Sequence, residues 1–255
     1  MVKATAIVQA RMSSSRLPGK VMMPLCGKPV IYHILERLRL CKSLESIVLA
    51  TSTRQDDNIL EDAAKQIGID CYRGSLDDVL ARIYFASQGR SSHIVRVCAD
   101  SPLLDSKIID AAVGFYLDTN ADIVKTINMP LGLGTEVLSY SALEQAYHNA
   151  FEVYQRDNVT PYIYENYSTY IMVFNPDYSH YRLTLDTEED FQIIEMIYAE
   201  LYTGKHDFFC REIINILERY PEIAAINSHV QQVQIQLNYA NGIRQIPVPL
   251  SLWIN

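Results

Sequence analysis

The sequence lacks the features that would assign it to a special class of protein. It has no apolar run of the roughly 18 residues that a membrane-spanning helix needs. Its cysteines number five, and no two of them stand at C-x-x-C spacing, which favours reduced, buried thiols in a cytoplasmic protein over a disulfide scaffold. No H-E-x-x-H or Cys/His grouping indicates a zinc site. We therefore expect an ordinary soluble cytoplasmic protein.

Negative charge is absent from one part of the chain. The 255 residues carry 22 Lys and Arg against 30 Asp and Glu, a net charge of −8. This acidic balance argues against a nucleic-acid partner, whose electrostatic footprint on a protein is basic. Residues 1–35 have five cations and no acid, which leaves 17 cations against 30 acids, a net charge of −13, in the other 220 residues. A basic segment on an acidic chain indicates an anion site.

Composition and hydrophobic pattern predict one α/β domain. At 49% hydrophobic and 20% charged residues, the chain falls in the range of globular proteins. Apolar runs alternate with segments of helical spacing, a pattern typical of β-α-β units and of a mostly parallel sheet with helices on both faces. Strands are expected at 4–10, 46–52, 71–72, 93–97 and 122–127, and helices at 29–41, 56–67, 77–87 and 108–117.

The strict alternation ends near residue 128, where glycine and proline mark a more irregular region. Beyond it we expect strands at 170–174 and 182–185, a helix at 188–201 and a last helix at 211–220. No repeat, low-complexity tract or clear linker divides the chain. One domain with an inserted or appended substrate portion is therefore the best description.

The segment after the first predicted strand is the strongest candidate for an anion site. Ligands of such sheets bind beyond the carboxyl ends of the strands. Residues 9–20 read Gln-Ala-Arg-Met-Ser-Ser-Ser-Arg-Leu-Pro-Gly-Lys. Small residues let backbone N–H groups approach an anion, and arginine offers paired donors to phosphate oxygens. The segment matches neither the Walker A nor the Rossmann glycine pattern, and a solvated surface loop is the alternative.

This segment resembles a known triphosphate loop. Ala10-Arg11-x-x-Ser14-x-Arg16-Leu17-Pro18-Gly19-Lys20 is similar to the loop of the cytidylyltransferases that activate acidic sugars, the CMP-Kdo synthetase type. The spore coat polysaccharide biosynthesis protein F branch of that superfamily is the more similar. The likeness runs from about residue 3 to about residue 234 and includes segments that begin at Arg73, Arg96, Val159 and Leu185.

The resemblance implies a fold of the nucleotide-diphospho-sugar transferase type and the transfer of CMP from CTP to an acidic sugar or related acceptor, with release of pyrophosphate, in surface polysaccharide biosynthesis. It implies a nucleotidyltransferase domain at 1–234, with a nucleotide-binding half at 1–127 and an acceptor and dimerisation half at 128–234. A tail follows at 235–255, and its apolar Trp253 and Ile254 are compatible with a homodimer. Neither a nucleic acid nor a membrane is an expected partner.

The resemblance also implies the residues of the site. Arg11, Arg16 and Lys20 would neutralise the β- and γ-phosphates and the leaving pyrophosphate, and with Asp100 they are the candidate catalytic residues. The candidate nucleotide-binding residues are Ala10, Arg11, Ser14, Arg16, Lys20, Arg73 and Asp100. The alternative for Arg73 is to support the neighbouring loop.

Asp100 and Asp186 are the candidate metal ligands. Each follows a predicted strand, and two carboxylates from separate strand ends could share one Mg²⁺, which prefers oxygen ligands. The resemblance implies this role for both residues. The alternatives are a turn residue at Asp100 and a helix N-cap at Asp186, because acidic residues and an apolar helix follow it.

The acceptor side departs from the family pattern. Glu136 stands where the family has an acidic substrate-side segment, and its alternative is an exposed turn residue. Ala99, Gly134 and Asn158 stand where the branch usually has Gly, Asp and His, so the acceptor is open. Two other functions remain: a nucleotide-sugar-dependent glycosyltransferase, although the chain lacks their common Asp-x-Asp motif, and a non-catalytic nucleotide-binding homologue.

Overall fold

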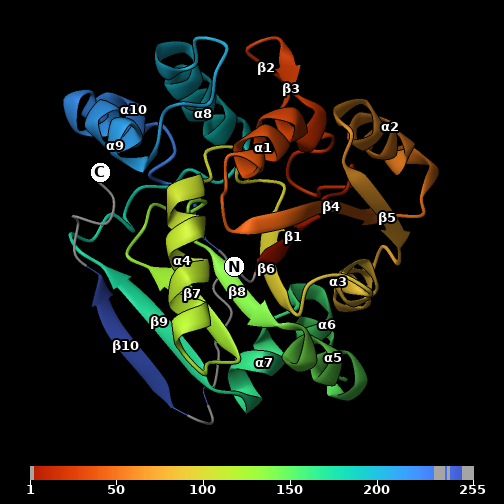
Figure 1. The fold of residues 1–255 in the computed structure, drawn as a ribbon. Coiled ribbons are helices and arrows are strands. Elements are labelled where there is room, and N and C mark those ends of the chain that lie inside the picture. Colours follow the sequence, from red (N-terminus) through yellow and green to blue (C-terminus); the bar gives the residue numbers. More distant parts are fainter. Residues whose placement is uncertain (1–2, 233–238, 240–241, 249–255) are drawn as a thin grey trace.

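One sheet runs through the computed structural model, which describes residues 3–232, 239 and 242–248 (Figure 1). Within these residues eight strands lie in the order β10-β9-β7-β8-β6-β1-β4-β5. Neighbours are parallel except β8, which is antiparallel to both β6 and β7. The strands are β1 (Ala4–Gln9), β4 (Leu44–Ser52), β5 (Asp70–Gly74), β6 (His93–Cys98), β7 (Ile123–Ile127), β8 (Glu136–Ser139), β9 (Thr169–Phe174) and β10 (Ile243–Val248). The predicted mostly parallel sheet is confirmed.

Helices cover both faces of the sheet, because strands buried on both sides need an apolar layer on each. In β1 the side chains of Ala6 and Val8 enter one core and that of Ile7 the other. The first core packs under α1 (Val30–Arg39), α2 (Asn58–Ile67), α4 (Ser106–Asp118), α8 (Glu188–Leu201), α9 (Cys210–Arg219) and α10 (Pro221–Ala225). The second packs under α3 (Val79–Ser87), α5 (Tyr140–Asn149) and α7 (Pro161–Asn166), and α6 (Val153–Asn158) contacts α3.

The elements up to residue 127 form where the hydrophobic pattern predicts them, and the helix at 188–201 has the predicted bounds. Three predictions differ. Residues 182–185 are not a strand, since only Arg182 forms an isolated bridge, to Leu131. The predicted helix at 211–220 forms as Cys210–Arg219, but it is not the last helix, because α10 follows it. Residues 243–248, inside the predicted tail, form β10 and pair with β9, whereas Trp253 and Ile254 lie outside the described residues.

Most of the elements that the pattern missed are short, although the missed helix α5 spans ten residues. The strand β8 has four residues, and α6 and α7 have six each, which is too few for a helical or strand period to stand out. Two further short strands, β2 (Pro24–Leu25) and β3 (Lys28–Pro29), form a small hairpin before α1. Among the described residues, no helix has the length and apolar character to cross a bilayer.

Two chain segments cross closely near the carboxyl ends of the strands, and Gly132 makes the crossing possible. The Leu183 N–H donates to the Leu131 carbonyl at 2.8 Å. A Cβ atom on Gly132 would lie 2.7 Å from the Leu183 carbonyl oxygen and 2.8 Å from the Thr184 nitrogen, and the φ of Gly132 is +100°. Only glycine fits this combination of contact and backbone angle.

We predict that Gly132→Ala destabilises the protein by about 2–3 kcal/mol, because the added methyl group meets backbone atoms and the φ angle is unfavourable for alanine. The free energy of unfolding in urea measures the effect. Gly134→Ala is the matched control, since a Cβ there would meet only Thr126 atoms at 3.7 Å or more. A loss at Gly132 no larger than that at Gly134 would contradict the role given to the crossing.

Candidate functional site

The loop after β1 is closed on itself and tied to the loop after β4. Gly19, at φ 73°, precedes a single 3-10 turn over Lys20–Met22, and its N–H donates to the Met12 carbonyl at 2.9 Å. The Met12 N–H donates to Asp57 Oδ1 at 2.7 Å, and the buried Asp57 also accepts the Ser52 N–H at 3.2 Å. Asp57 therefore positions the loop. No local pattern indicates this contact, because Met12 and Asp57 are 45 residues apart.

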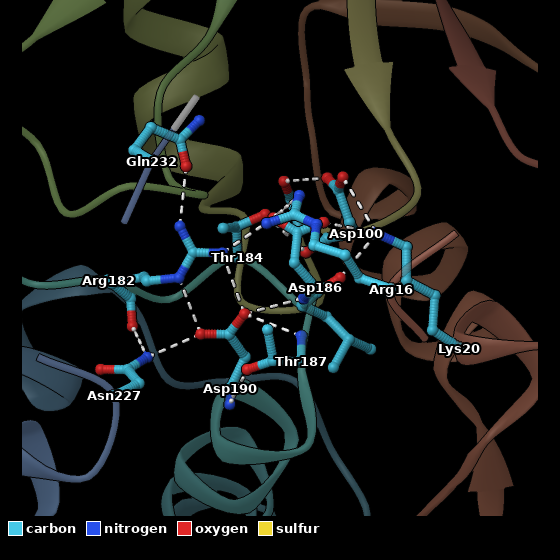
Figure 2. A network of polar contacts seen from close by, with 12 residues as sticks. Arg16, Lys20, Asp100, Arg182, Thr184, Asp186, Thr187, Asp190, Asn227 and Gln232 are labelled. Atoms are coloured by element: carbon cyan, nitrogen blue, oxygen red, sulfur yellow. Dashed lines mark hydrogen bonds and ion pairs between the residues drawn. The ribbon is translucent and has the colours of Figure 1, made fainter. Parts of the chain in front are cut away.

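The 3-10 turn directs Lys20 toward two carboxylates from distant parts of the chain. Its ammonium group lies 2.9 Å from Asp186 Oδ1 and 3.4 Å from Asp100 Oδ2, and it donates to the Leu185 carbonyl at 2.6 Å (Figure 2). An ammonium group has three N–H donors, so these three acceptors account for all of them. Lys20 is buried and brings Asp100 and Asp186 together.

Asp186 is surrounded by cations. Besides Lys20, Arg16 lies 3.0 Å and Arg182 2.8 Å from its Oδ2. Burial raises the pKa of Asp186, but the hydrogen bond and charge of Lys20 and the charge of Arg16 outweigh it and hold the pKa below its ordinary value. Asp186 is therefore a firmly ionised carboxylate. The N-cap of α8 is Thr187, whose side chain accepts the Asp190 N–H. The alternative prediction that Asp186 caps this helix is therefore wrong.

Asp100 follows β6 and lies at a turn in which the Ser101 N–H donates to the Cys98 carbonyl at 3.3 Å. Its own carbonyl accepts the Leu185 N–H at 2.7 Å, which fixes the end of β6 against the segment that carries Asp186. Its side chain is 28% exposed, against 11% for Asp186. Asp100 is thus the more accessible of the two carboxylates.

The two aspartates suit a hard divalent cation, because both are oxygen donors and they converge on one positive charge. No group of three or more His, Cys, Asp and Glu in the part of the chain that the structure describes could hold a metal by itself. A metal bound here would need further oxygen ligands, and phosphate groups of a nucleotide are of the right kind.

A cavity of about 640 Å³ opens beyond the carboxyl ends of β6 and β7. Arg16, Asp100 and Asp186 line one part of it, and Arg96, Lys125 and Glu136 line another. The cavity brings together four of the predicted site residues, namely Arg16, Asp100, Glu136 and Asp186. Gly134 and Asn158, two of the departures from the family pattern, also line it, whereas Ala99 is buried.

Glu136 is part of a strand and not an exposed turn residue. It lies opposite Arg96 in the β6–β8 pair, with 2.7 Å between Glu136 Oε2 and Arg96 Nη1. Tyr164 donates its hydroxyl to Glu136 Oε1 at 2.6 Å. Burial raises the pKa of Glu136, but Arg96 and the Tyr164 hydroxyl outweigh it, so the pKa lies below the ordinary value.

Five predicted nucleotide-binding residues do not line the cavity that holds Asp100, and these are Ala10, Arg11, Ser14, Lys20 and Arg73. Arg11 is exposed, and its guanidinium pairs with no other described residue. Arg73 donates to the Ser52 carbonyl at 3.0 Å and the Arg54 carbonyl at 2.7 Å. Arg73 therefore supports the loop after β4, which is the alternative role considered for it above. Its contact with a nucleotide stays a prediction.

Comparison with known proteins shows which family the chain belongs to. Residues 5–226 match the family model for cytidylyltransferases. The spore coat polysaccharide biosynthesis protein SpsF of Bacillus subtilis is 32% identical over 86% of this chain and 95% of that protein. A solved cytidylyltransferase from Leptospira borgpetersenii is 29% identical, with a TM-score of 0.83 over 92% of this chain and 100% of that chain. A 3-deoxy-manno-octulosonate cytidylyltransferase of Nitratidesulfovibrio vulgaris is 29% identical over 49% of this chain and 50% of that protein.

The chain therefore belongs to the cytidylyltransferase family, a family of nucleotidyltransferase enzymes. The resemblance drawn from residues 10–20 is confirmed, as is the likeness to the spore coat branch. The fold is that of the family, since the sheet and its helices superpose on a solved member along nearly the whole chain.

We predict that Glu136→Gln lowers the free energy of unfolding at neutral pH by about 1–3 kcal/mol, because Arg96 loses its charged partner while Tyr164 can still donate a hydrogen bond. A carboxyl whose pKa is depressed by folding contributes stability above its unfolded pKa and loses it in acid. The difference between wild type and variant should therefore shrink as the pH falls below about 4.5. Urea unfolding between pH 7 and pH 3 measures this, with the exposed Glu222→Gln as the control. A difference that grows in acid would contradict the assignment.

Proposed function

We propose that the protein transfers CMP from CTP to an acidic sugar or related sugar-like acceptor in the synthesis of a surface polysaccharide, with release of pyrophosphate. The observation that carries the proposal is the convergence of Arg16 and Lys20, from a phosphate-type loop, with Asp100 and Asp186 at the edge of one cavity. We further propose that it acts in the cytoplasm as a homodimer.

The loop cations suit the binding of a triphosphate. Arg11 is exposed and unpaired among the described residues, and Arg16 is 45% exposed beside the cavity. The pair between Arg16 and Asp186 is worth at most about 1 kcal/mol when exposed in this way, so a polyanion can take Arg16 from Asp186. Lys20 keeps its contacts with both aspartates and adds positive charge beneath the phosphates.

A Mg²⁺ ion is part of the proposal, with Asp100 and Asp186 as the residues that would hold it. When bound, Mg²⁺ neutralises charge on phosphate oxygens during the transfer. The two carboxylates fit this role because they are oxygen donors in contact with the same ammonium group. Asp100 would be the more accessible ligand, since Asp186 has both oxygens in ion pairs.

In the proposed reaction, a hydroxyl oxygen of the acceptor attacks the α-phosphorus in line. The new bond joins the acceptor oxygen to the α-phosphorus, the bond from that phosphorus to the bridging oxygen breaks, and pyrophosphate leaves with its electron pair. The proton of the hydroxyl passes to solvent. Positioning and charge stabilisation carry most such transfers, so the part of the cavity near Arg96, Lys125 and Glu136 has the task of orienting the acceptor.

Pyrophosphate release from CTP tests the reaction. In the presence of Mg²⁺ and a panel of acidic sugars, 3-deoxy-manno-octulosonate among them, we expect release with at least one acceptor. Asp100→Ala should lower kcat/KM by about 100-fold or more, because charge stabilisation at the phosphates is lost. Asp70→Ala, at an exposed position in β5, is the control. Release with no acceptor, or full activity of Asp100→Ala, would refute the proposal.

The base preference is tested by titrating the four ribonucleoside triphosphates in a calorimeter. We expect CTP to bind most tightly. Arg16→Gln should weaken CTP binding about tenfold, a typical effect of losing a hydrogen bond between charged groups. Tight binding of CTP together with no turnover on any acceptor would instead favour a non-catalytic nucleotide-binding protein.

A further inference from the structure

A buried arginine–aspartate pair lies directly behind Asp186 and has no part in the function proposed above. Arg182 donates from Nε to Asp190 Oδ1 at 2.8 Å and from Nη2 to Asp190 Oδ2 at 3.0 Å. The Arg182 side chain is 8% exposed and that of Asp190 is fully buried. Two N–H···O bonds between the same groups fix the orientation of the guanidinium as well as its position.

The pair holds Asp186 at two points. The Nη2 of Arg182 also donates to Asp186 Oδ2 at 2.8 Å, so one nitrogen contacts two carboxylates. Asp190 Oδ2 accepts the backbone N–H of Asp186 at 2.9 Å. Figure 2 shows Arg182 and Asp190 together on the side of Asp186 that is turned away from Lys20. Arg182 and Asp190 therefore hold Asp186 in addition to its contacts with Arg16 and Lys20.

Asn227 adds two further hydrogen bonds to the pair. Its side-chain amide nitrogen donates to Asp190 Oδ1 at 2.8 Å and to the Arg182 carbonyl at 2.9 Å. Asp190 also accepts the backbone N–H of Thr187 at 3.0 Å. The carboxylate of Asp190 is thus fully satisfied, which is the condition under which a buried charge can be kept.

Arg16 competes with Arg182 for the same oxygen of Asp186. It lies 3.0 Å from Asp186 Oδ2, but it comes from the loop and its side chain is 45% exposed. Exposed ion pairs are easily broken, whereas breaking a buried one leaves a charge without a partner. A polyphosphate in the cavity would therefore draw Arg16 away from Asp186 and leave Arg182 in place.

We propose that Arg182, held by Asp190, is a positioning residue of the nucleotide site that keeps Asp186 neutralised and in place, so that Arg16 is released to the phosphates. This inference rests on the proposed function. Without Arg182, the described counter-ions of Asp186 would be Lys20 and Arg16 alone. Asp186 would then hold Arg16 more strongly against the phosphates, and phosphate binding would weaken.

The test removes both charges of the pair with Arg182→Gln and Asp190→Asn together, so that no buried charge is left alone. Binding of inorganic triphosphate and of CTP is measured by calorimetry in EDTA, where a metal makes no contribution. We expect the Kd of both probes to rise about tenfold, the size of effect typical for a lost charged contact. The matched control is Arg90→Gln with Asp70→Asn, an exposed pair 2.9 Å apart, which should leave both Kd values unchanged.

A further variant separates positioning from a purely structural role. Adding Asp186→Asn to the double variant should restore tight binding of both probes, because an uncharged side chain no longer retains Arg16. An unchanged Kd in the double variant, with only a lower Tm, would overturn the proposal, and so would failure of Asp186→Asn to restore binding.

If the double variant does not fold, Arg182→Lys applies the same test, because one ammonium group cannot reproduce the planar contact with two carboxylates. Its Kd values should also rise, and unchanged values would overturn the proposal. A wild-type protein that binds neither probe, in EDTA or with Mg²⁺, would refute the proposed function together with this inference. Normal binding by wild type and variants alike would refute this inference alone.

Discussion

The contact between Lys20 and Asp186 is the interaction on which the site depends. It joins residues 166 positions apart, and both side chains are buried. A buried charge without its partner is costly, so the loop after β1 and the segment before α8 must come together when the chain folds. Asp100 and Leu185 meet the same ammonium group, which places the end of β6 there as well. A single cation thus assembles three parts of the site.

The cavity results from a change in strand direction. The strand β8 is antiparallel between β6 and β7, and it places Glu136 opposite Arg96 at the carboxyl end of β6. The close crossing at Gly132 brings the segment of Asp186 to the same edge of the sheet. One part of the cavity therefore presents Arg16 and the two aspartates, and another presents the Arg96–Glu136 pair. This division suits a nucleotide on one side and an acceptor on the other.

Local patterns predicted most of the first half of the chain, but in the second half only β9, α8 and α9. Repeated apolar runs and helical spacing up to residue 127 are long enough to identify each element, and residues 10–20 identified the family. The strand β8 and the helices α6 and α7 are too short for such a signal. Asp186 shows a second limit, because an acidic stretch before an apolar helix favours a cap, yet Thr187 takes that role and frees Asp186 for the cations.

The sequence by itself determined the class of fold, the family and the identity of the loop cations, because these depend on residues that are close together in the chain. Only the tertiary structure decided what each charge contacts. It turned Lys20 inward to two aspartates, left Arg11 exposed, gave Arg73 to the neighbouring loop and placed Arg182 and Asp190 behind Asp186. Such contacts join residues up to 166 positions apart, and charge pairing at that separation depends on how the whole chain packs, which no local pattern records.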